Sequence, residues 1–153
     1  MKRTYIITLL LSLCSLFTTH AQDNLFDQFA DQEGVSSVYI SKAMLSLMPD
    51  MKADGVDIGG IASKLDNIRI LSCENPDLLP KLKKETAFIN PKNGYEELMR
   101  INDAGEKTTI YLKQDKSDKK EFVLLSNEKN EFNLIVITGS LTLEEIQGII
   151  HKD

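Results

Sequence analysis

Tryptophan is absent from this chain, and histidine and cysteine occur only twice each among its 153 residues. His20 and Cys14 lie in the first 21 residues, which we expect to be cleaved off, so the remainder keeps only Cys73 and, near its end, His151. A Ser-His-Asp or Cys-His centre needs a histidine that the surrounding structure holds in position, and a zinc site needs three or four His, Cys or carboxylate ligands. We therefore predict neither a catalytic residue of these kinds nor a cofactor.

Carboxylates are plentiful, but their spacing matches neither a calcium loop nor a glycosidase pair. An EF-hand loop beginning at Asp50 would have Lys52 at its third position and Ile61 at its twelfth, where oxygen ligands are required. Glu96 and Glu97 do not form an acid/base pair by themselves, because adjacent residues of a strand point to opposite faces. A site assembled from carboxylates that are distant in the sequence stays open.

Basic residues are in the minority, with 18 Lys and Arg against 23 Asp and Glu and a net charge of −5. Removal of the first 21 residues takes away two of the basic residues and makes the chain more acidic still. Nucleic-acid-binding proteins present a basic face, and electrostatic binding to anionic lipid also needs clustered Lys and Arg. The composition therefore argues against nucleic acid and against an anionic membrane surface as partners.

The first 21 residues (1–21) have the pattern of a secretory signal peptide. Two basic residues follow the initial Met, an apolar run covers Ile6–Phe17, and small residues occupy Thr19 and Ala21, as signal peptidase requires. The run is shorter than the roughly 20 apolar residues that span a bilayer. We expect cleavage after Ala21, export to the periplasm or cell envelope, and a mature chain (22–153) without a transmembrane segment.

The two cysteines have different expected roles. A lipoprotein signal places a small residue directly before the modified cysteine, whereas Leu13 is bulky and the apolar run continues beyond Cys14. We therefore do not expect lipid anchoring through Cys14. Cys73 follows the apolar residues Ile70 and Leu71 and is predicted to be a buried small hydrophobe. An intermolecular disulfide is the alternative.

Hydrophobic periodicity predicts one α+β domain over residues 22–153. Its length is sufficient to bury roughly two thirds of the surface of the unfolded chain. Helices are predicted at 24–32, 42–48, 58–65, 78–89 and from 142 onward, and strands at 35–40, 68–74, 95–101, 108–114, 121–126 and 132–138, with a loop over 50–60. Short turns join the later strands, so we expect an antiparallel β-meander of about five to six strands with helices packed mainly on one face.

Polar residues mark three of the predicted helix starts. Ser41 and Asp77 stand where an N-cap is expected. Thr142, with Glu145 three residues later, forms the capping-box pattern. Apolar residues then recur at Leu143, Ile146, Ile149 and Ile150, the spacing of one buried helix face.

Two later strands are apolar in both phases, which is unusual for a sheet with one wet face. We assign to the helix-covered face the set Phe122, Leu124, Phe132, Leu134 and Val136. The second face then carries Val123, Leu125, Ile135 and Ile137. This second apolar face is expected to be covered as well. The N-terminal helix or a loop is one candidate, and a protein interface formed by these four residues, such as that of a homodimer, is the other.

Several segments resemble a family of small secreted proteins from Gram-negative, Bacteroides-type gut bacteria, catalogued as domain of unknown function 4252. The matching segments are 26–30, 34–44, 65–68, 135–139 and 141–146. They consist of helix faces, strands and caps and extend over nearly the whole mature chain. The resemblance implies an envelope location and a single domain, and it implies no activity and no catalytic residue.

Together these patterns favour an exported, non-enzymatic binding or interaction module of the bacterial cell envelope whose partner is a protein. The alternative is a small secreted hydrolase that depends on carboxylates or on a carboxylate-bound metal. A deep pocket with convergent Asp or Glu side chains would favour this alternative.

Overall fold

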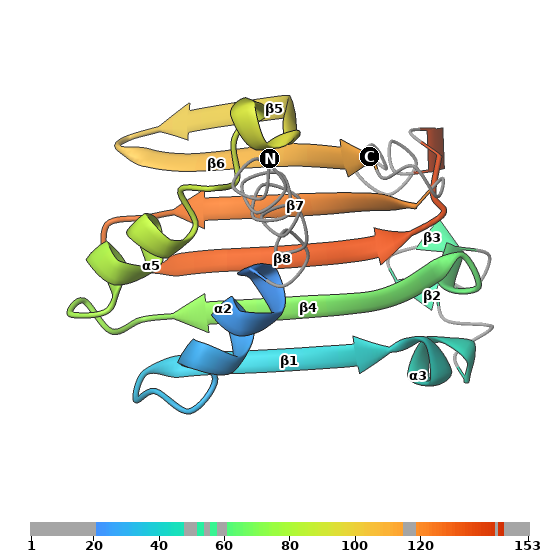
Figure 1. Cartoon of the computed structure of the whole chain (residues 1–153), viewed down its shortest axis with the longest axis horizontal. Coiled ribbons are helices and arrows are strands. Elements are labelled where there is room, and N and C mark those ends of the chain that lie inside the picture. Colours follow the sequence, from blue (N-terminus) through green and yellow to red (C-terminus); the bar gives the residue numbers. More distant parts are fainter. Residues whose placement is uncertain are drawn as a thin grey trace, which may run out of the picture.

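The computed structural model describes residues 21–47, 52–53, 56–57, 61–114, 119–142 and 144–145. Its elements in chain order are α2 (Ala21–Phe29), β1 (Val35–Ser41), α3 (Lys42–Ser46), β2 (Lys52–Ala53), β3 (Val56–Asp57), β4 (Leu65–Cys73), α5 (Leu79–Glu85), the 3-10 turn η1 (Pro91–Asn93), β5 (Glu96–Asp103), β6 (Glu106–Gln114), β7 (Lys120–Asn127) and β8 (Phe132–Gly139). Six strands form one antiparallel sheet in the order β1-β4-β8-β7-β6-β5 (Figure 1). The predicted α+β class is confirmed.

The meander predicted for the second half is present as β5 to β8, in which each strand pairs with the next. The β5–β6 hairpin turns at Ala104 and Gly105, whose φ angles are 46° and 93°. Positive φ at both residues is the requirement of the two-residue turn that matches strand twist. Beyond β8 the sheet continues with β4 and then β1, so the first half of the chain supplies the last two strands at one side.

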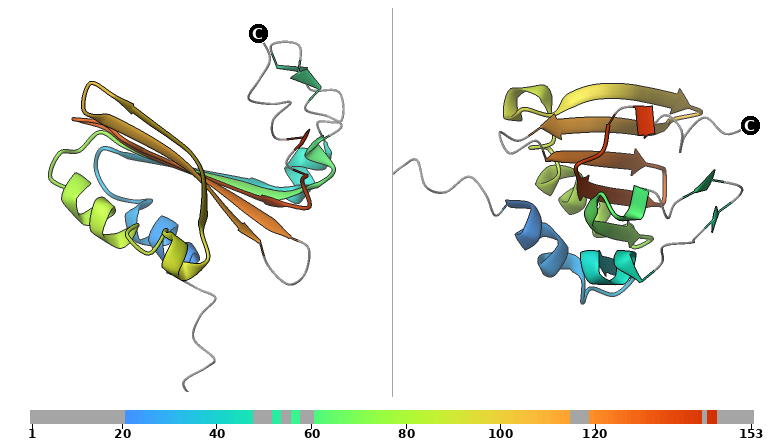
Figure 2. Two further views of the ribbon diagram at one scale, coloured as in Figure 1. Left: turned by 90° about the horizontal axis from the view of Figure 1, so that it is seen from above. Right: turned by 90° about the vertical axis from the view of Figure 1, so that its right-hand side faces the viewer.

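One face of the sheet, called here the helix face, is covered by α2 and α5 (Figures 1 and 2). Phe29 of α2 and Leu82 of α5 are fully buried against the sheet. The same buried cluster includes the strand residues Leu71, Cys73, Tyr111, Val123, Phe132, Leu134 and Val136. The prediction that Cys73 is buried is confirmed, since its exposed fraction is 0%.

The other face, called the second face, has a smaller buried cluster at one end of the sheet. There Leu45 of α3, Ala62 and Leu141 pack with Leu112 and Phe122. Figure 2 (left) shows α3 on the side of the sheet opposite to α2 and α5. The described helices therefore cover the helix face broadly, whereas on the second face the described residues provide cover at this end only.

The sequence-based assignment of the β7 side chains to a face is wrong. The β7–β8 register pairs Val123 with Val136 and Phe122 with Ile137, so Val123 belongs to the helix face and Phe122 to the second face. The β8 assignments are correct. Because β7 is apolar at four consecutive positions, its pattern contains no alternation from which the phase can be read. The tight connection, in which Glu128 N donates to Glu131 O at 2.9 Å, is consistent with this register.

Two local predictions also need correction. Asp77 does not cap α5, which begins at Leu79 after a Leu78 N-cap without a side-chain hydrogen bond. Instead Asn75 Oδ1 accepts from Asp77 N at 3.0 Å and shapes the turn before the helix. The predicted helix over 58–65 is reduced to Ile61 and Ala62 among its described residues, and the predicted loop over 50–60 contains the short strands β2 and β3.

The N-cap of α3 is as predicted. Ser41 has an extended backbone and its hydroxyl accepts from Met44 N at 3.3 Å. The predicted helical residue Met48 lies outside the described residues, as do Leu143, Ile146, Ile149 and Ile150 of the last predicted helix.

Gly139 provides a first test of this packing. A Cβ added at Gly139 would clash with the Lys64 carbonyl oxygen and lie 2.9 Å from Leu65 Cα. Both are backbone atoms that cannot rotate away, so Gly139→Ala is expected to lower the free energy of unfolding by about 2 to 4 kcal/mol. Denaturant titration measures this change. Gly94→Ala is the matched control, because Gly94 has φ of 85° but open space around it, and strain alone costs about 1 kcal/mol. Equal losses in the two variants would contradict the close approach.

Candidate functional site

A row of apolar side chains crosses the middle of the second face from one edge of the sheet to the other. Each of the six strands contributes one residue, and neighbours in the row are direct cross-strand partners. We call this row the apolar stripe, and its members are Val38, Ile70, Ile135, Leu124, Ile110 and Met99.

The stripe is not covered by any described part of the chain. Val38 is 43% exposed and Met99 38% exposed, and the four inner residues keep partial exposure. None of the six belongs to either buried cluster or is packed against one. A contiguous exposed apolar patch is the surface feature that most often marks an interaction site.

The two rows that flank the stripe differ from it: one is covered and the other is largely polar. One neighbouring row packs into the buried cluster under α3 and consists of Ile40, Ile68, Ile137, Phe122 and Leu112. The other neighbouring row is polar from β1 to β6, with Ser36, Ser72, Asn133, Ser126 and Thr108, and ends on β5 at the exposed Ile101. In this polar row the hydroxyls of Thr108 and Ser126 are 2.9 Å apart and hydrogen-bonded. The stripe therefore has a covered side and a polar rim.

The four residues predicted as an interface do not form one surface. Val123 is fully buried on the helix face, and Leu125 is packed against the same core. Ile137 lies on the second face in the row beneath α3. Only Ile135 belongs to the stripe. The other stripe residues were not predicted, because finding them requires the register of every strand, although the apolar phase that contains Ile135 was visible in the sequence.

A charged cluster joins three segments at the α3 end of the sheet. The carboxylate of Asp66, at the start of β4, forms ion pairs with Lys42 Nζ at 3.2 Å and with Lys119 Nζ at 2.7 Å. Lys119 and then Lys42 hold the pKa of the Asp66 carboxyl below its ordinary value, against the opposing effect of burial. Asp66 thus ties α3 and the start of β7 to β4.

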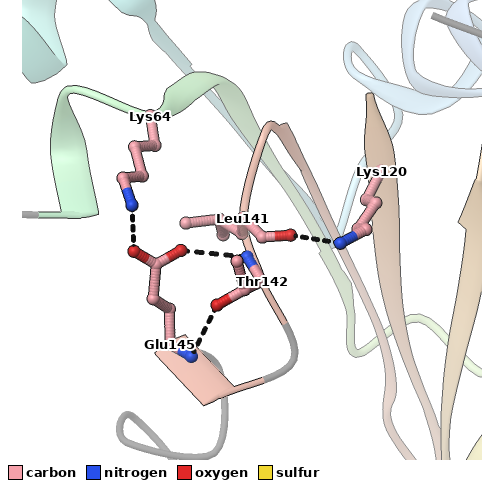
Figure 3. Close-up of polar contacts among 5 residues, drawn as sticks. All are labelled: Lys64, Lys120, Leu141, Thr142 and Glu145. Atoms are coloured by element: carbon pink, nitrogen blue, oxygen red, sulfur yellow. Dashed lines mark hydrogen bonds and ion pairs between the residues drawn. The ribbon is translucent and has the colours of Figure 1, made fainter. Parts of the chain in front are cut away.

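The predicted capping box at Thr142 is confirmed and lies beside this end of the sheet. Thr142 N donates to Glu145 Oε2 at 2.9 Å, and Glu145 N donates to Thr142 Oγ1 at 3.2 Å. Figure 3 shows that Lys64 reaches the same Glu145 carboxylate, while Lys120 Nζ donates to the Leu141 carbonyl at 2.9 Å. The Lys64 ammonium, with the Thr142 N–H, lowers the pKa of Glu145. These contacts hold the segment after β8 against the turn before β4.

Two hollows lie elsewhere on the described surface, and both are open rather than enclosed. The first, of about 340 Å³, is lined by Phe26, Asp27, Ser37, Val38, Tyr39 and Arg69. The Arg69 guanidinium there lies 5.7 Å from the ring centre of Phe26 and 5.8 Å from that of Tyr39, so it is held as a cation–π contact. The second, of about 370 Å³, is lined by Glu74, Glu106, Glu128, Lys129, Asn130 and Glu131.

Within the described ranges, no group of three or more His, Cys, Asp or Glu side chains is arranged to hold a metal ion. His151 and the Asp50 loop start lie outside those ranges. None of the described helices has the length and apolar character that a bilayer crossing requires.

The fold thus defines an α+β domain whose most distinctive feature is a sheet face that the described residues cover only in part. The family model described as "Domain of unknown function (DUF4252)" matches residues 28–149, and the chain belongs to this family. No curated protein matches the chain.

Asp66 provides a pH-dependent test of the charged cluster. Because its pKa is lowered in the folded state, it stabilises the fold above its ordinary pKa of 3.8, and this contribution disappears as the pH falls through the lowered value. Both lysines are largely exposed, so Asp66→Asn is expected to cost about 0.5 to 1 kcal/mol at neutral pH. The wild-type and variant stabilities should then converge under acid conditions.

Denaturant titrations at a series of pH values measure this difference. Asp77→Asn is the control, because Asp77 is exposed and makes no ion pair with the described residues. A loss for Asp66→Asn that is the same at every pH would contradict the electrostatic origin.

Proposed function

We propose that this chain is an exported, non-enzymatic interaction module of the bacterial cell envelope and that it binds a protein through the apolar stripe. The observation that carries the proposal is the row of six apolar side chains across the second face, which no described residue covers. A soluble domain that leaves such a row in water gives up the free energy that its burial would provide. A partner that covers the row recovers this free energy.

The shape and surroundings of the stripe favour a protein as the partner. It runs across a sheet face rather than into a deep cavity, and small-molecule sites are usually concave. Its polar rim, with Ser72 and Asn133 beside the stripe, matches the pattern of an apolar interface centre with a polar margin. The acidic net charge gives no support to nucleic acid or anionic lipid.

The alternative, a carboxylate- or metal-dependent hydrolase, receives no support from a described site. The hollow lined by glutamates is open, with four carboxylates at loops and strand ends. Catalytic carboxylates need a water-excluding pocket that separates the pKa values of acid and base. The interaction module is therefore the function that the geometry favours.

Charge placed in the stripe tests this function. Ile135→Lys adds a cation to the centre of the stripe on a partly exposed side chain. It should abolish capture of the partner from native envelope extracts, because binding would bury the charge without a counter-ion. Ser72→Lys adds the same charge in the polar row of the same face, and it should reduce capture far less.

Circular dichroism and thermal unfolding measure whether both variants are folded. Full capture by a folded Ile135→Lys variant contradicts binding through the stripe. If Ile135→Lys does not fold, Met99→Lys takes its place in the experiment, since Met99 is an exposed member of the same row.

Export has its own test. The protein isolated from cells should begin at Gln22 and fractionate with the periplasm or envelope, because signal peptidase cleaves after small residues such as Ala21. Intact-mass measurement identifies the N-terminus. An Ala21→Arg variant, which blocks the cleavage position, should retain the leader. An uncleaved wild-type chain in the cytosol would contradict export.

A further inference from the structure

The β1 strand lies at the edge of the sheet and has no charged residue. Its seven residues, VSSVYIS, contain no proline, and its pairing with β4 is continuous from Val35 to Ser41 without a bulge. Tyr39 is 64% exposed and Val38 43% exposed. An uncharged edge strand without proline or a bulge is a template for pairing with another strand, and proteins normally protect such edges.

The opposite edge of the sheet, formed by β5, has the features that protect an edge strand from pairing. β5 carries four charged residues in eight, namely Glu96, Glu97, Arg100 and Asp103. Its register with β6 is interrupted by a bulge between Glu97 and Met99. Charges and bulges are the devices that prevent edge-to-edge association. The contrast indicates that the β1 edge is left open for a partner strand.

The hydrogen-bond phase of β1 identifies which backbone groups face outward. Glu74 N donates to the Gly34 carbonyl at 3.0 Å, and these two residues continue the β1–β4 register. Because an antiparallel ladder alternates, residues 36, 38 and 40 bond to β4, while Ser37 and Tyr39 direct their N–H and C=O groups to the open edge.

We propose that the β1 edge pairs with β1 of a second copy of this chain in an antiparallel, two-fold arrangement centred on Val38. In this register Ser37 of each copy is the hydrogen-bonded partner of Tyr39 of the other, so the outward-facing N–H and C=O groups of these two residues are satisfied in both copies. Val38 then meets its own counterpart as a non-hydrogen-bonded pair, in which side chains lie closest.

The flanks of β1 support a second copy as the occupant. Glu33 precedes the strand and Lys42 follows it, and both are exposed. Antiparallel pairing places the start of one strand beside the end of the other, so Glu33 of each copy comes near Lys42 of the other. Lys42 also pairs with Asp66 of its own chain, so each end of the paired strands would bring opposite charges together, and β1 itself carries no charge.

The same register aligns the apolar stripes of the two copies. Val38 is the stripe residue at this edge, so pairing at Val38 makes the two stripes continuous across the two-fold axis. The pairing itself rests on the β1 edge and its hydrogen-bond phase. It does not depend on whether the stripe binds another protein.

Sedimentation equilibrium of the exported protein over a wide concentration range tests the association. The wild type should form a reversible dimer. Ser37→Pro removes an outward-facing N–H without removing a bond to β4, and it should raise the dimer dissociation constant at least about tenfold. Ser37→Ala keeps that N–H and should dimerise nearly as the wild type does.

Disulfide trapping tests the register. Val38→Cys should form a linked dimer under mild oxidation, because only the residue on the two-fold axis meets itself. Ser36→Cys, on the same face of the same strand, would lie opposite Ile40 of the other copy and should not form a linked dimer. The native Cys73 is fully buried and does not interfere.

A wild type that stays monomeric at its highest soluble concentration overturns the proposal. So does a dimer that Ser37→Pro leaves unchanged, or one in which Ser36→Cys links as readily as Val38→Cys. Loss of envelope-partner capture by Ile135→Lys with the dimer intact separates the stripe's function from the pairing of β1.

Discussion

The antiparallel register between β7 and β8 is the constraint on which most of the molecule depends. These two strands occupy the middle of the sheet, and each contains a run of four consecutive apolar residues, Phe122–Leu125 in β7 and Leu134–Ile137 in β8. The register selects Val123, Phe132, Leu134 and Val136 for the core beneath α2 and α5. It simultaneously leaves Leu124 and Ile135 side by side on the second face. A shift by one residue would exchange the core and the exposed row of β7.

Two faces of one sheet therefore have different energetic roles. The helix face is closed by side chains from α2 and α5 and accounts for the larger buried cluster. In the described part of the chain, the second face is closed at the end where α3, Ala62 and Leu141 pack. Asp66 and Glu145 reinforce that end with ion pairs to lysines from neighbouring segments. Among the residues that the structure describes, the middle of the second face keeps partly exposed apolar side chains in an ordered row, the apolar stripe.

Local features were predictable from the sequence because short segments determine them. Ser41 caps α3 and the Thr142–Glu145 capping box forms as expected, since each depends on residues within one turn. The strands β5 to β8 were predictable because short turns join them. Asp77 was assigned wrongly because Asn75, two residues earlier, forms the competing side-chain hydrogen bond.

Non-local features were not predictable. The phase of β7 has no alternation to reveal it, and the close approach of Gly139 to Lys64 and Leu65 joins segments far apart in the chain. The position of β1 at an edge depends on β4 pairing with β8. For these reasons only Ile135 of the predicted interface lies in the apolar stripe.

The pairing of β4 with β8 has a consequence for how the chain folds. β4 comes from the first half of the sequence, whereas β8 is the last of the described strands in chain order. Until β8 arrives, α2 and α5 lack the central strand against which they pack, and β4 has an unpaired side. Contacts between such distant segments slow folding because a long loop must close first. A chain of this topology therefore completes its sheet, and with it the core beneath α2 and α5, only after β8 has joined β4.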